Sequence, residues 1–566
     1  MHPRLPSWQD VIGVVLVMGL LGLIATAGHQ LTASLLLSRQ PVITLSPTAL
    51  PFYAFRTMTR MLLALLASLL FTFTYSTLAA KSRRAEAVLI PLLDVLQSVP
   101  ILGYLSFTVV FFVSLFPGNM LGLEMAAIFT IFTSQAWNMA FSFYQSLKTV
   151  PRDLDEATRC FRSSGWQRFW RLEVPFALPG LVWNMMMSMS GGWFFVVASE
   201  AISVGDTQYT LPGIGAYVAR AIQDRNLAAV GWAISAMTVT ILLYDQLLFR
   251  PLVAWADKFR FEQTAASITP RSWVLDLFDR SRLFRWMVRP VGNTLHAAAY
   301  LRFRVPAFFP DFAGGRPLRR LGDVAWYGLV FALLAYGARA LVRLLLPALS
   351  WHDVAVALDD GALTLARVII LIIIASVVWV PIGVYVGLRS KLAQKVQPIA
   401  QFLAAFPANL FFPLAVFLIV RFALSPGIWL SPLMILGTQW YILFNIIAGA
   451  SAFPSDLREA AASFRIRPLR LWCDVLLPGV FPYYVTGAIT ASGGAWNASI
   501  VSEAVNWGPT KLDGSGLGAY IARTTEAGDY PRIALGIAIM SVLVITMNRL
   551  LWRPLYAFAE RRMRLD

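Results

Sequence analysis

Residues 156–162 read Glu-Ala-Thr-Arg-Cys-Phe-Arg, and residues 459–465, 303 positions later, read Glu-Ala-Ala-Ala-Ser-Phe-Arg. The same offset matches the Ser-Glu-Ala of residues 199–201 with the Ser-Glu-Ala of residues 502–504. Self-similarity at a constant offset indicates a tandem duplication, so we expect two copies of one structural unit. Further matched pairs are Pro151 with Pro454, Gly215 with Gly518 and, at an offset of 307, Arg60 with Arg367 and Pro100 with Pro407.

The composition is that of a membrane protein. Of the 566 residues, 58% are hydrophobic and only 14% are charged, whereas soluble proteins average about 25% charged residues. Two cysteines, Cys160 and Cys473, allow at most one bridge, which excludes a disulfide scaffold. The net charge of +17 is interpreted as the excess of basic residues in cytoplasmic loops rather than as a nucleic-acid interface. We therefore expect an all-α polytopic protein in a lipid bilayer, with no nucleic acid as partner.

Apolar runs of about 20 residues, the length that crosses a bilayer, predict twelve transmembrane spans, six in each half. The third span of each half contains an internal proline, Pro100 or Pro407, and is expected to be kinked or divided. The first run resembles a signal peptide, but the second half has a matching first span. The expected spans are 11–36, 58–80, 88–116, 122–147, 177–200 and 228–249, then 322–348, 363–388, 396–423, 428–450, 480–501 and 531–552.

Basic residues gather in alternate loops, including 81–84, 148–171 and 250–320, which identifies those loops as cytoplasmic. Both termini are then expected in the cytoplasm. Six spans per copy leave the two copies parallel, related by an axis along the membrane normal, so a pore is expected between the halves.

The loops at 151–175 and 454–478 carry a motif. Each begins with a Glu-Ala pair and ends eighteen and nineteen residues later in Val174-Pro175 or Leu477-Pro478. These loops resemble the EAA loop of binding-protein-dependent ABC importer permeases, which docks short helices on the ATP-hydrolysing subunit. The apolar residues of the first loop recur at helical spacing and need a partner to bury them. The resemblance implies the following ATPase-coupling residues: Asp155, Glu156, Ala157, Phe161, Arg162, Glu459, Ala460, Phe464 and Arg465.

One position departs from the family pattern. The family has a glycine six residues after the glutamate, where this sequence has Arg162 and Arg465. The turn between the two short helices is therefore expected elsewhere, at residues 163–165 and 467–468, which contain Ser-Ser-Gly and Arg-Pro.

A second resemblance narrows the subfamily to permeases for nitrate, sulfonates, taurine and bicarbonate. It implies the type I ABC importer transmembrane fold, as two parallel six-helix repeats fused in one chain of a bacterial inner membrane. The expected domains are a first permease repeat over 1–255 with its core at 55–255, a basic cytoplasmic linker over 256–320, and a second repeat over 321–566 with its core at 360–560. The resemblance rests on Ser190-Gly191-Gly192-Trp193, Ser199-Glu200-Ala201 and Pro212 to Tyr217, with their counterparts at 492–496, 502–504 and 516–520.

Small residues, polar residues and two amphipathic tryptophans in the spans are candidates for the translocation path. They are Gln97, Ser190, Gly191, Gly192, Trp193, Gln439, Ser492, Gly493, Gly494, Trp496 and Asn497. Small residues at helix contacts are also common for packing reasons alone. Glu200 and Glu503 end the fifth spans near the outer face. Because a carboxylate repels an anion and is costly to bury, we expect an outer gate or structural role for them.

The chain has no Gly-x-x-x-x-Gly-Lys-Ser/Thr phosphate loop, no metal-ligand spacing among its four histidines and no Ser-His-Asp arrangement. We therefore expect a transport subunit and not an enzyme, with no cofactor or metal of its own. Two ATPase subunits would use ATP and Mg²⁺, and a solute-binding protein would deliver a small anionic solute. The alternative is a secondary transporter or channel with 6+6 repeats and no ATPase, which gives no reason for two matching Glu-Ala loops.

Overall fold

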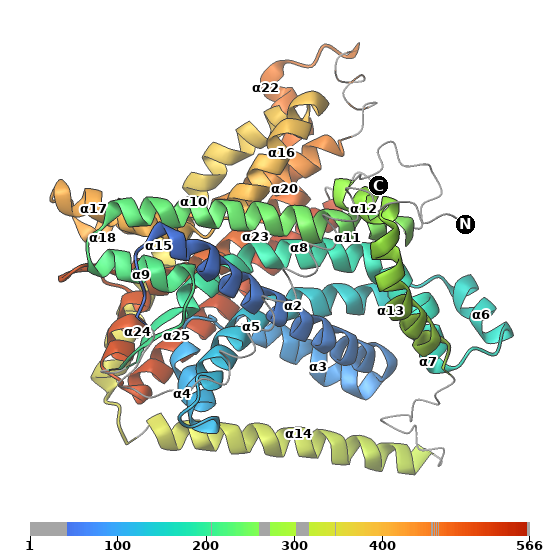
Figure 1. Cartoon of the computed structure of the whole chain (residues 1–566), viewed down its shortest axis with the longest axis horizontal. Helices are drawn as coiled ribbons and strands as arrows, with labels where there is room; N and C mark the ends of the chain where they lie inside the picture. The colour runs from blue at the N-terminus through green and yellow to red at the C-terminus, as the bar shows by residue number, and fades with distance from the viewer. Residues whose placement is uncertain are drawn as a thin grey trace.

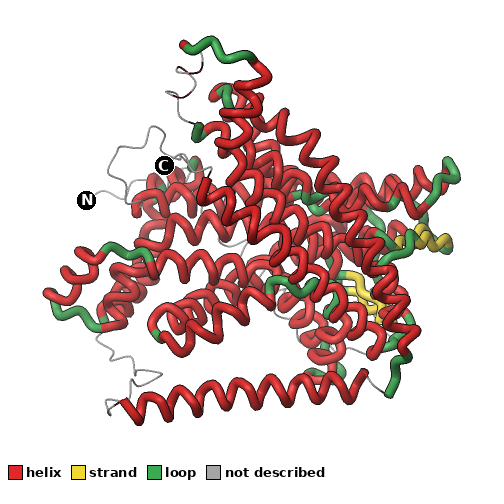
Figure 2. Tube along the Cα trace, turned by 180° about the vertical axis from the view of Figure 1, so that it is seen from behind, coloured by secondary structure: helices red, strands yellow, loops and turns green. Residues whose placement is uncertain are grey.

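The computed structural model describes residues 42–562 except 205–206, 260–271, 302–315, 346, 454–456, 458, 460 and 462. Within these residues the chain is a bundle of helices with two short β-hairpins. Figure 1 shows the long helix α14 (Arg316–Leu345) along one edge of the bundle. Figure 2 shows both hairpins toward the same end of the molecule.

The two halves contain matching elements. The first half contains α2 (Leu50–Lys81), α3 (Arg83–Leu96), α4 (Leu105–Leu115), α5 (Leu121–Lys148), α6 (Arg152–Cys160), α7 (Gly165–Arg168), α8 (Val174–Ser199), β1 (Ala201–Val204), β2 (Thr207–Thr210), α9 (Ile214–Gln223), α10 (Leu227–Tyr244), η4 (Asp245–Phe249) and α11 (Arg250–Ala256). The linker contains α12 (Trp273–Arg280) and α13 (Arg282–Tyr300) before α14. The second half contains α15 (Trp351–Gly387), α16 (Ser390–Ala405), η6 (Ala408–Phe411), α17 (Phe412–Arg421), α18 (Pro426–Trp429), α19 (Ser431–Leu436), α20 (Gln439–Ser451), α22 (Pro468–Arg470), η7 (Leu471–Leu476), α23 (Leu477–Ser502), β3 (Ala504–Trp507), β4 (Thr510–Asp513), α24 (Leu517–Glu526), α25 (Tyr530–Met547), η8 (Asn548–Trp552) and α26 (Arg553–Arg562).

The duplication is visible from the fifth span onward. Helices α8 and α23 both have 26 residues, α9 and α24 both have 10, and α10 and α25 both have 18. The hairpins pair in the same antiparallel register, Ala201 with Thr210 and Ala504 with Asp513. The two halves therefore keep the same local structure at the offset of 303.

By length and hydropathy, seven of the described helices are able to cross a membrane, or eight when a bent pair is counted as one span. The expected span 11–36 lies outside the described residues. Span 122–147 is the single helix α5, whose hydropathy is lowered by Glu124, Gln135 and Asn138. Span 322–348 corresponds to α14, which includes several arginines. Seven or eight spans are thus supported, and the count of twelve stays a prediction.

The third span of each half is divided, as the prolines predict. Helices α3 and α4 are separated by turns around Pro100. In the second half, the segments 391–405 and 408–421 meet at an angle of 78°. Proline lacks an amide hydrogen and pushes the preceding residue out of the helical region, and Phe406 is accordingly extended with ψ 128°.

Each half completes the hydrophobic core of the other. The core of the first half, around Met61 and Tyr217, includes Phe406 and Leu410 from the divided third span of the second half. The core of the second half, around Trp496, includes Ile101 and other residues from the third span of the first half. The two halves are therefore interlocked through their third spans.

Candidate translocation path and coupling surfaces

A buried carboxylate lies at the C-terminal end of α8. Glu200 follows α8 and is fully buried. Its Oε1 accepts hydrogen bonds from Arg60 Nη1 and Thr57 Oγ1, each at 2.7 Å, and its Oε2 accepts one from the backbone N–H of Gly215 at 2.7 Å. Since Gly215 lies in the first turn of α9, the carboxylate satisfies a free amide at the positive end of that helix.

The cluster around Glu200 is balanced in charge. Glu124 accepts from Arg60 Nε at 2.6 Å and from Arg56 Nη2 at 2.6 Å. Two guanidinium groups thus face two carboxylates, all of them buried. Buried charges are tolerated when they are paired and hydrogen-bonded in this way.

The second half repeats this arrangement with one difference. Glu503 accepts from Arg367 Nη1 at 2.9 Å, from Thr364 Oγ1 at 3.0 Å and from the backbone N–H of Gly518 at 2.8 Å. The position that corresponds to Glu124 is Gly427, and its carbonyl accepts from Arg367 Nη2 at 3.1 Å. A backbone oxygen there takes the place of the second carboxylate.

Two glycines after each hairpin allow the next helix to pack closely against the buried carboxylate. A Cβ on Gly213 would lie 2.2 Å from Cδ of Glu200, and one on Gly215 would lie 2.2 Å from the carbonyl oxygen of Val197. A Cβ on Gly518 would lie 2.3 Å from the Ser499 carbonyl. The Gly-x-Gly pattern therefore permits the close approach of helix α9 or α24 to the end of the fifth span.

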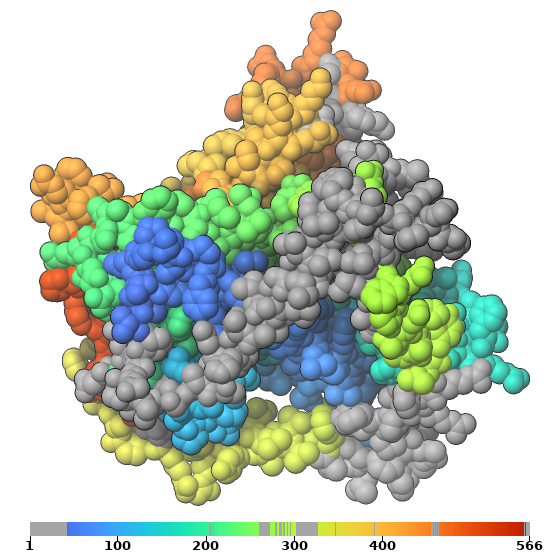
Figure 3. Space-filling model, in the orientation of Figure 1, coloured from blue at the N-terminus to red at the C-terminus, as the bar shows by residue number. Residues whose placement is uncertain are grey.

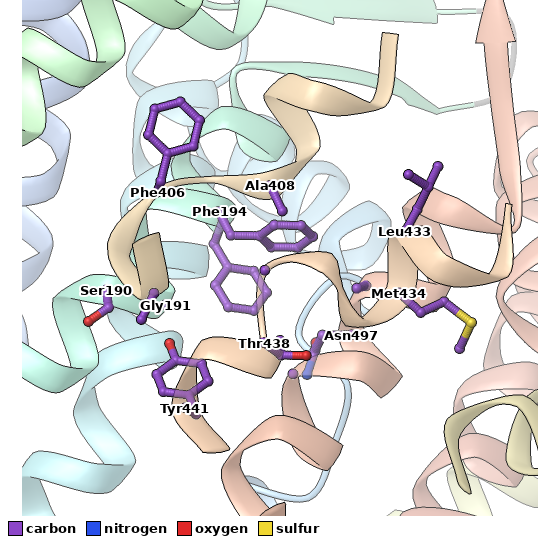
Figure 4. A pocket seen from close by; sticks show the side chains of 15 residues that line it. Ser190, Gly191, Phe194, Phe406, Ala408, Leu433, Met434, Thr438, Tyr441 and Asn497 are labelled. Carbon is purple, nitrogen blue, oxygen red and sulfur yellow. The ribbon is translucent and has the colours of Figure 1, made fainter. Parts of the chain in front are cut away.

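A small cavity lies between the halves (Figure 4). It has about 70 Å³ of space and is lined from both halves, by Ser190, Gly191 and Phe194 of α8 and by residues that include Tyr441 and Asn497. No residue with a charged side chain lines it among the described part of the chain. It is a narrow, uncharged space with aromatic rings and a few hydroxyl and amide groups.

Two matching hydrogen bonds join the halves beside this cavity. Asn497 Oδ1 of α23 accepts from the backbone N–H of Ile101 at 2.7 Å. Asn409 Nδ2 donates to the carbonyl of Phe194 in α8 at 3.2 Å. Phe194 and Asn497 are counterparts at the offset of 303. Each break in a third span is thus held against the same position of the opposite fifth span.

The expected path residues fall into two groups. Ser190, Gly191, Gly494 and Asn497 line the cavity, and a Cβ on Gly493 would meet no atom within 4 Å. The others do not line this cavity. Gly192 packs against Gln135 and Met61. Gln439 accepts a hydrogen bond from Trp379, and Gln97 donates one to Asp94. The remaining three, Trp193, Ser492 and Trp496, are buried, and Trp193 lines the larger cavity described next.

A larger cavity of about 450 Å³ adjoins the first one through Ser190. It lies between α8 and η4 of the first half and α16 of the second, and Arg250 and Asp245 line it with 3.4 Å between Nε and Oδ2. The counterpart of Arg250 is Arg553, which forms an ion pair across the halves with Asp94. The two sides of the interface therefore differ. In the described structure Arg250 pairs within its own half, whereas Arg553 pairs with the opposite half.

The expected coupling loops, residues 151–175 and 454–478, have their described Glu-Ala segments at the surface of the molecule (Figure 3). Glu156, Ala157 and Phe161 are exposed on or next to α6, and Glu459 and Phe464 are exposed in the second loop. Phe161 and Phe464 are each 82% exposed. Asp155 is turned inward and pairs with Arg159 and Arg168, while Ala460 lies outside the described residues.

The expected position of the turn in these loops is wrong. Arg162 and Arg465 themselves adopt the left-handed conformation, with φ of 50° and 48°. In the first loop the N–H of Ser163 bonds to the Thr158 carbonyl, and in the second the N–H of Ile466 bonds to the Ala461 carbonyl. These are the bonds of a helix end that normally uses glycine. The arginines therefore occupy the conformation of the family's glycine, and the segments after them begin the next helices.

The model of the binding-protein-dependent transport system inner membrane component family matches residues 72–250 and again residues 379–565. The chain belongs to this family. The two matches contain the two expected coupling loops as well as α8 and α23, so one chain carries the family domain twice. As a family member it is a multi-pass inner-membrane transport component and not an enzyme.

Several curated relatives of this permease transport small polar solutes according to their names. A nitrate import permease of Leptolyngbya laminosa is 25% identical over 189 residues, which is 33% of this chain and 64% of the relative. A bicarbonate transport system permease of Synechococcus elongatus is 26% identical over 31% of this chain and 60% of the relative. A glycine betaine/proline betaine permease of Escherichia coli is 29% identical over 30% of this chain and 43% of the relative. The chain thus covers less than two thirds of each, and no solved structure matches it.

Four residues of the buried clusters around Glu200 and Glu503 were not expected from the sequence of this permease. Thr57 and its counterpart Thr364 could have been found, because the offset of 307 that pairs Arg60 with Arg367 also pairs these two threonines. Arg56 and Glu124 have no such signal, since their counterparts are a leucine and a glycine. The described residues include no group of three or more His, Cys, Asp or Glu side chains placed to hold a metal.

Proposed function

We propose that this chain is the membrane subunit of an ATP-driven ABC importer that moves a small solute into the cytoplasm by alternating access. Two ATPase subunits, which use ATP and Mg²⁺, dock on the loops at 151–175 and 454–478. A solute-binding protein delivers the solute at the side of the hairpins. The chain has twelve spans in the type I importer arrangement, with both termini in the cytoplasm of a bacterial cell.

The observation that carries this proposal is the pair of exposed phenylalanines. Phe161 and Phe464 occupy the same repeat position and are each 82% exposed. A phenylalanine gains about 1.5–3 kcal/mol when it is buried, so two of them left outside at matching positions indicate a partner at each loop. Two copies of an ATPase in a symmetric pair satisfy that requirement.

The path proposed for the solute follows one face of each fifth span. On α23 this face carries Thr486, Thr490, Gly493 and Asn497, whose spacing of four, three and four residues keeps them on one side of the helix. Thr486 and Thr490 are exposed, whereas 13 of the 26 residues of α23 are buried. The face begins at the cavity between the halves, which Asn497 lines.

The opposite face on α8 has a different chemistry. The counterparts of the threonines are Trp183 and Met187, followed by Ser190 and Phe194. Trp183 is 45% exposed and stacks on Phe444 of the second half, with 6.0 Å between the ring centroids. The proposed path thus has a hydroxyl-bearing wall on one side and an aromatic wall on the other.

We propose a small anion of the nitrate, bicarbonate, sulfonate or taurine class as the solute. Hydroxyl, amide and backbone N–H groups are able to donate hydrogen bonds to such an anion. The carboxylates nearest the outer end, Glu200 and Glu503, are already paired with arginines and so place little net negative charge on its way. Weak, uncharged contacts also favour release on the cytoplasmic side.

Co-purification and uptake test the ATPase coupling. Glu156→Arg together with Glu459→Arg is expected to abolish both uptake and recovery of an ATPase with the tagged chain. The matched control is Glu526→Arg, because Glu526 is 43% exposed in its side chain and lies at the end of α24, away from both loops. Uptake that continues without any ATPase would instead establish the secondary transporter.

Competition identifies the solute class. Uptake of labelled solute into cells is measured against unlabelled nitrate, bicarbonate, taurine, alkanesulfonates and glycine betaine. The Thr486→Val and Thr490→Val variants are expected to raise the KM for uptake of the solute that these competitions identify, without changing recovery of the ATPase. An unchanged KM in both variants would contradict the proposed path. Competition by glycine betaine alone would contradict the assignment of an anion as the solute.

A further inference from the structure

The linker between the halves is packed on the first coupling loop. Trp166 Nε1 donates to the carbonyl of Ala298, and Gln167 Nε2 donates to the carbonyl of Tyr300, each at 2.8 Å. The guanidinium of Arg171 lies over the ring of Tyr300, 4.6 Å from its centroid. Figure 1 shows the end of α13 beside α7. The C-terminal end of α13 therefore covers one face of the segment that follows α6.

The second coupling loop presents the same face without such a cover in the described structure. The counterparts of Trp166, Gln167 and Arg171 are Leu469, Arg470 and Asp474, and all three are exposed. Leu469 is 77% exposed. The three side chains that contact α13 from the first loop are thus replaced in the second loop by side chains of different chemistry, and these are exposed.

We propose that the face formed by Leu469, Arg470, Cys473 and Asp474 is bound directly by the ATPase subunit of the second loop. The first ATPase meets α13 at the corresponding place. This inference rests on the proposed function and goes beyond it, because it makes the two docking surfaces unequal in size and chemistry. The chain thereby distinguishes its two motor subunits.

Two observations favour an ATPase as the occupant of this face. The face is continuous with the coupling surface, since Phe464, 82% exposed, precedes Leu469 by five residues. It also combines an apolar side chain with both a basic and an acidic one, Arg470 and Asp474, a mixture that suits the polar rim and apolar centre of a protein interface.

The native cysteines allow a direct test. Cys473 is exposed, and Cys160→Ser leaves it as the single thiol. Its rate of reaction with a membrane-impermeant maleimide is compared in the complex as purified with its ATPases and in inside-out vesicles stripped of peripheral subunits by urea. We expect labelling to be about tenfold slower in the complex, because a bound surface reacts only when it opens.

A reference position separates the possible failures. Ser463→Cys, in a chain without the native cysteines, reports docking itself, because Ser463 is exposed beside Phe464 and its replacement leaves that ring in place. Shielding of Ser463→Cys with an unchanged rate at Cys473 would overturn the inference and leave the proposed function standing. No shielding of Ser463→Cys would overturn the proposed function. Slow labelling of Cys473 in stripped vesicles would show that lipid covers the face, which also overturns the inference.

Discussion

Replacement of Glu200 by glutamine is the sharpest test of the buried cluster around Glu200. Oε1 of Glu200 accepts from Arg60 and Thr57, and Oε2 accepts from the N–H of Gly215. Glutamine has one oxygen and one NH₂ group in their place. Whichever way the amide turns, its NH₂ faces another donor. The change also leaves Arg56 and Arg60 with Glu124 as their remaining carboxylate.

The expected loss follows from the burial of these groups. Removing one partner of a buried ion pair costs about 3–5 kcal/mol. A cooperative unit of roughly 150–250 residues loses about 2–4 °C in Tm per kcal/mol, so Glu200→Gln is expected to lower Tm by about 6–20 °C. Unfolding is followed by thermal denaturation of the purified protein in detergent.

Two further variants are compared with Glu200→Gln, one at its counterpart and one at an exposed control position. Glu503→Gln alters the corresponding carboxylate of the second half and is expected to lower Tm as well. Glu526→Gln removes an exposed pair with Lys511, with side chains 43% and 70% exposed, and is expected to cost less than about 1 kcal/mol. A Tm for Glu200→Gln that matches that of Glu526→Gln would refute a stabilising role for the buried cluster.

Three further predictions concern single positions. Gly215→Ala places a Cβ 2.2 Å from the carbonyl oxygen of Val197, and such overpacking is expected to cost about 1–3 kcal/mol, measured as a lower Tm. Arg162→Gly removes the cost of a left-handed conformation and is expected to stabilise the end of α6 by about 1 kcal/mol, measured as slower amide exchange. Asp94→Asn removes the ion pair with Arg553, and the side chain of Arg553 is 57% exposed. The free energy of unfolding is therefore expected to fall by less than about 1 kcal/mol, measured as a small change in Tm. Spin labels on α3 and α26 are expected to report a wider separation in this variant.

Each of these variants has a control within the chain. A Cβ on Gly231 would meet no atom within 4 Å, so an equal loss for Gly231→Ala would contradict the steric explanation. Arg159→Gly, inside α6, is expected to destabilise that helix, and a gain there would remove the conformational argument for Arg162. Gln401→Asn, at the counterpart of Asp94, is expected to leave the spin-label distance unchanged. If Asp94→Asn does not alter the spin-label distance between α3 and α26, the Asp94–Arg553 ion pair does not hold the two halves together.

The duplicated sequence predicted much of this fold because each copy repeats the same local signals. The fifth spans, the segments after them and the divided third spans all follow from matched residues and from Pro100 and Pro407. The path candidates were harder to assign. Gly191 and Gly192 are adjacent, yet one faces the cavity and the other packs on Gln135, because helical rotation separates neighbours by about 100°.

Other features depend on contacts between the copies, which no local pattern records. The insertion of Phe406 into the core of the first half requires knowledge of how the halves meet. The position of the turn at Arg162 and Arg465 was missed because arginine rarely takes a positive φ, and residue preference alone places a turn at serine, glycine or proline. Arg56 and Glu124 were missed because they lie 68 positions apart and neither of them is repeated in the second half.

The exchange of third spans between the two cores has a consequence for the biogenesis of this protein. The first half ends near residue 259, but Phe406 and Leu410, which complete its core, are synthesised roughly 150 residues later. At 5–20 residues per second, a ribosome needs about 8–30 s to make that segment. During this interval the helices of the first half lie in the bilayer with an unfilled site in their core, which the insertion machinery or lipid must occupy. A gene split between the halves would lengthen that wait to the time two chains need to find each other.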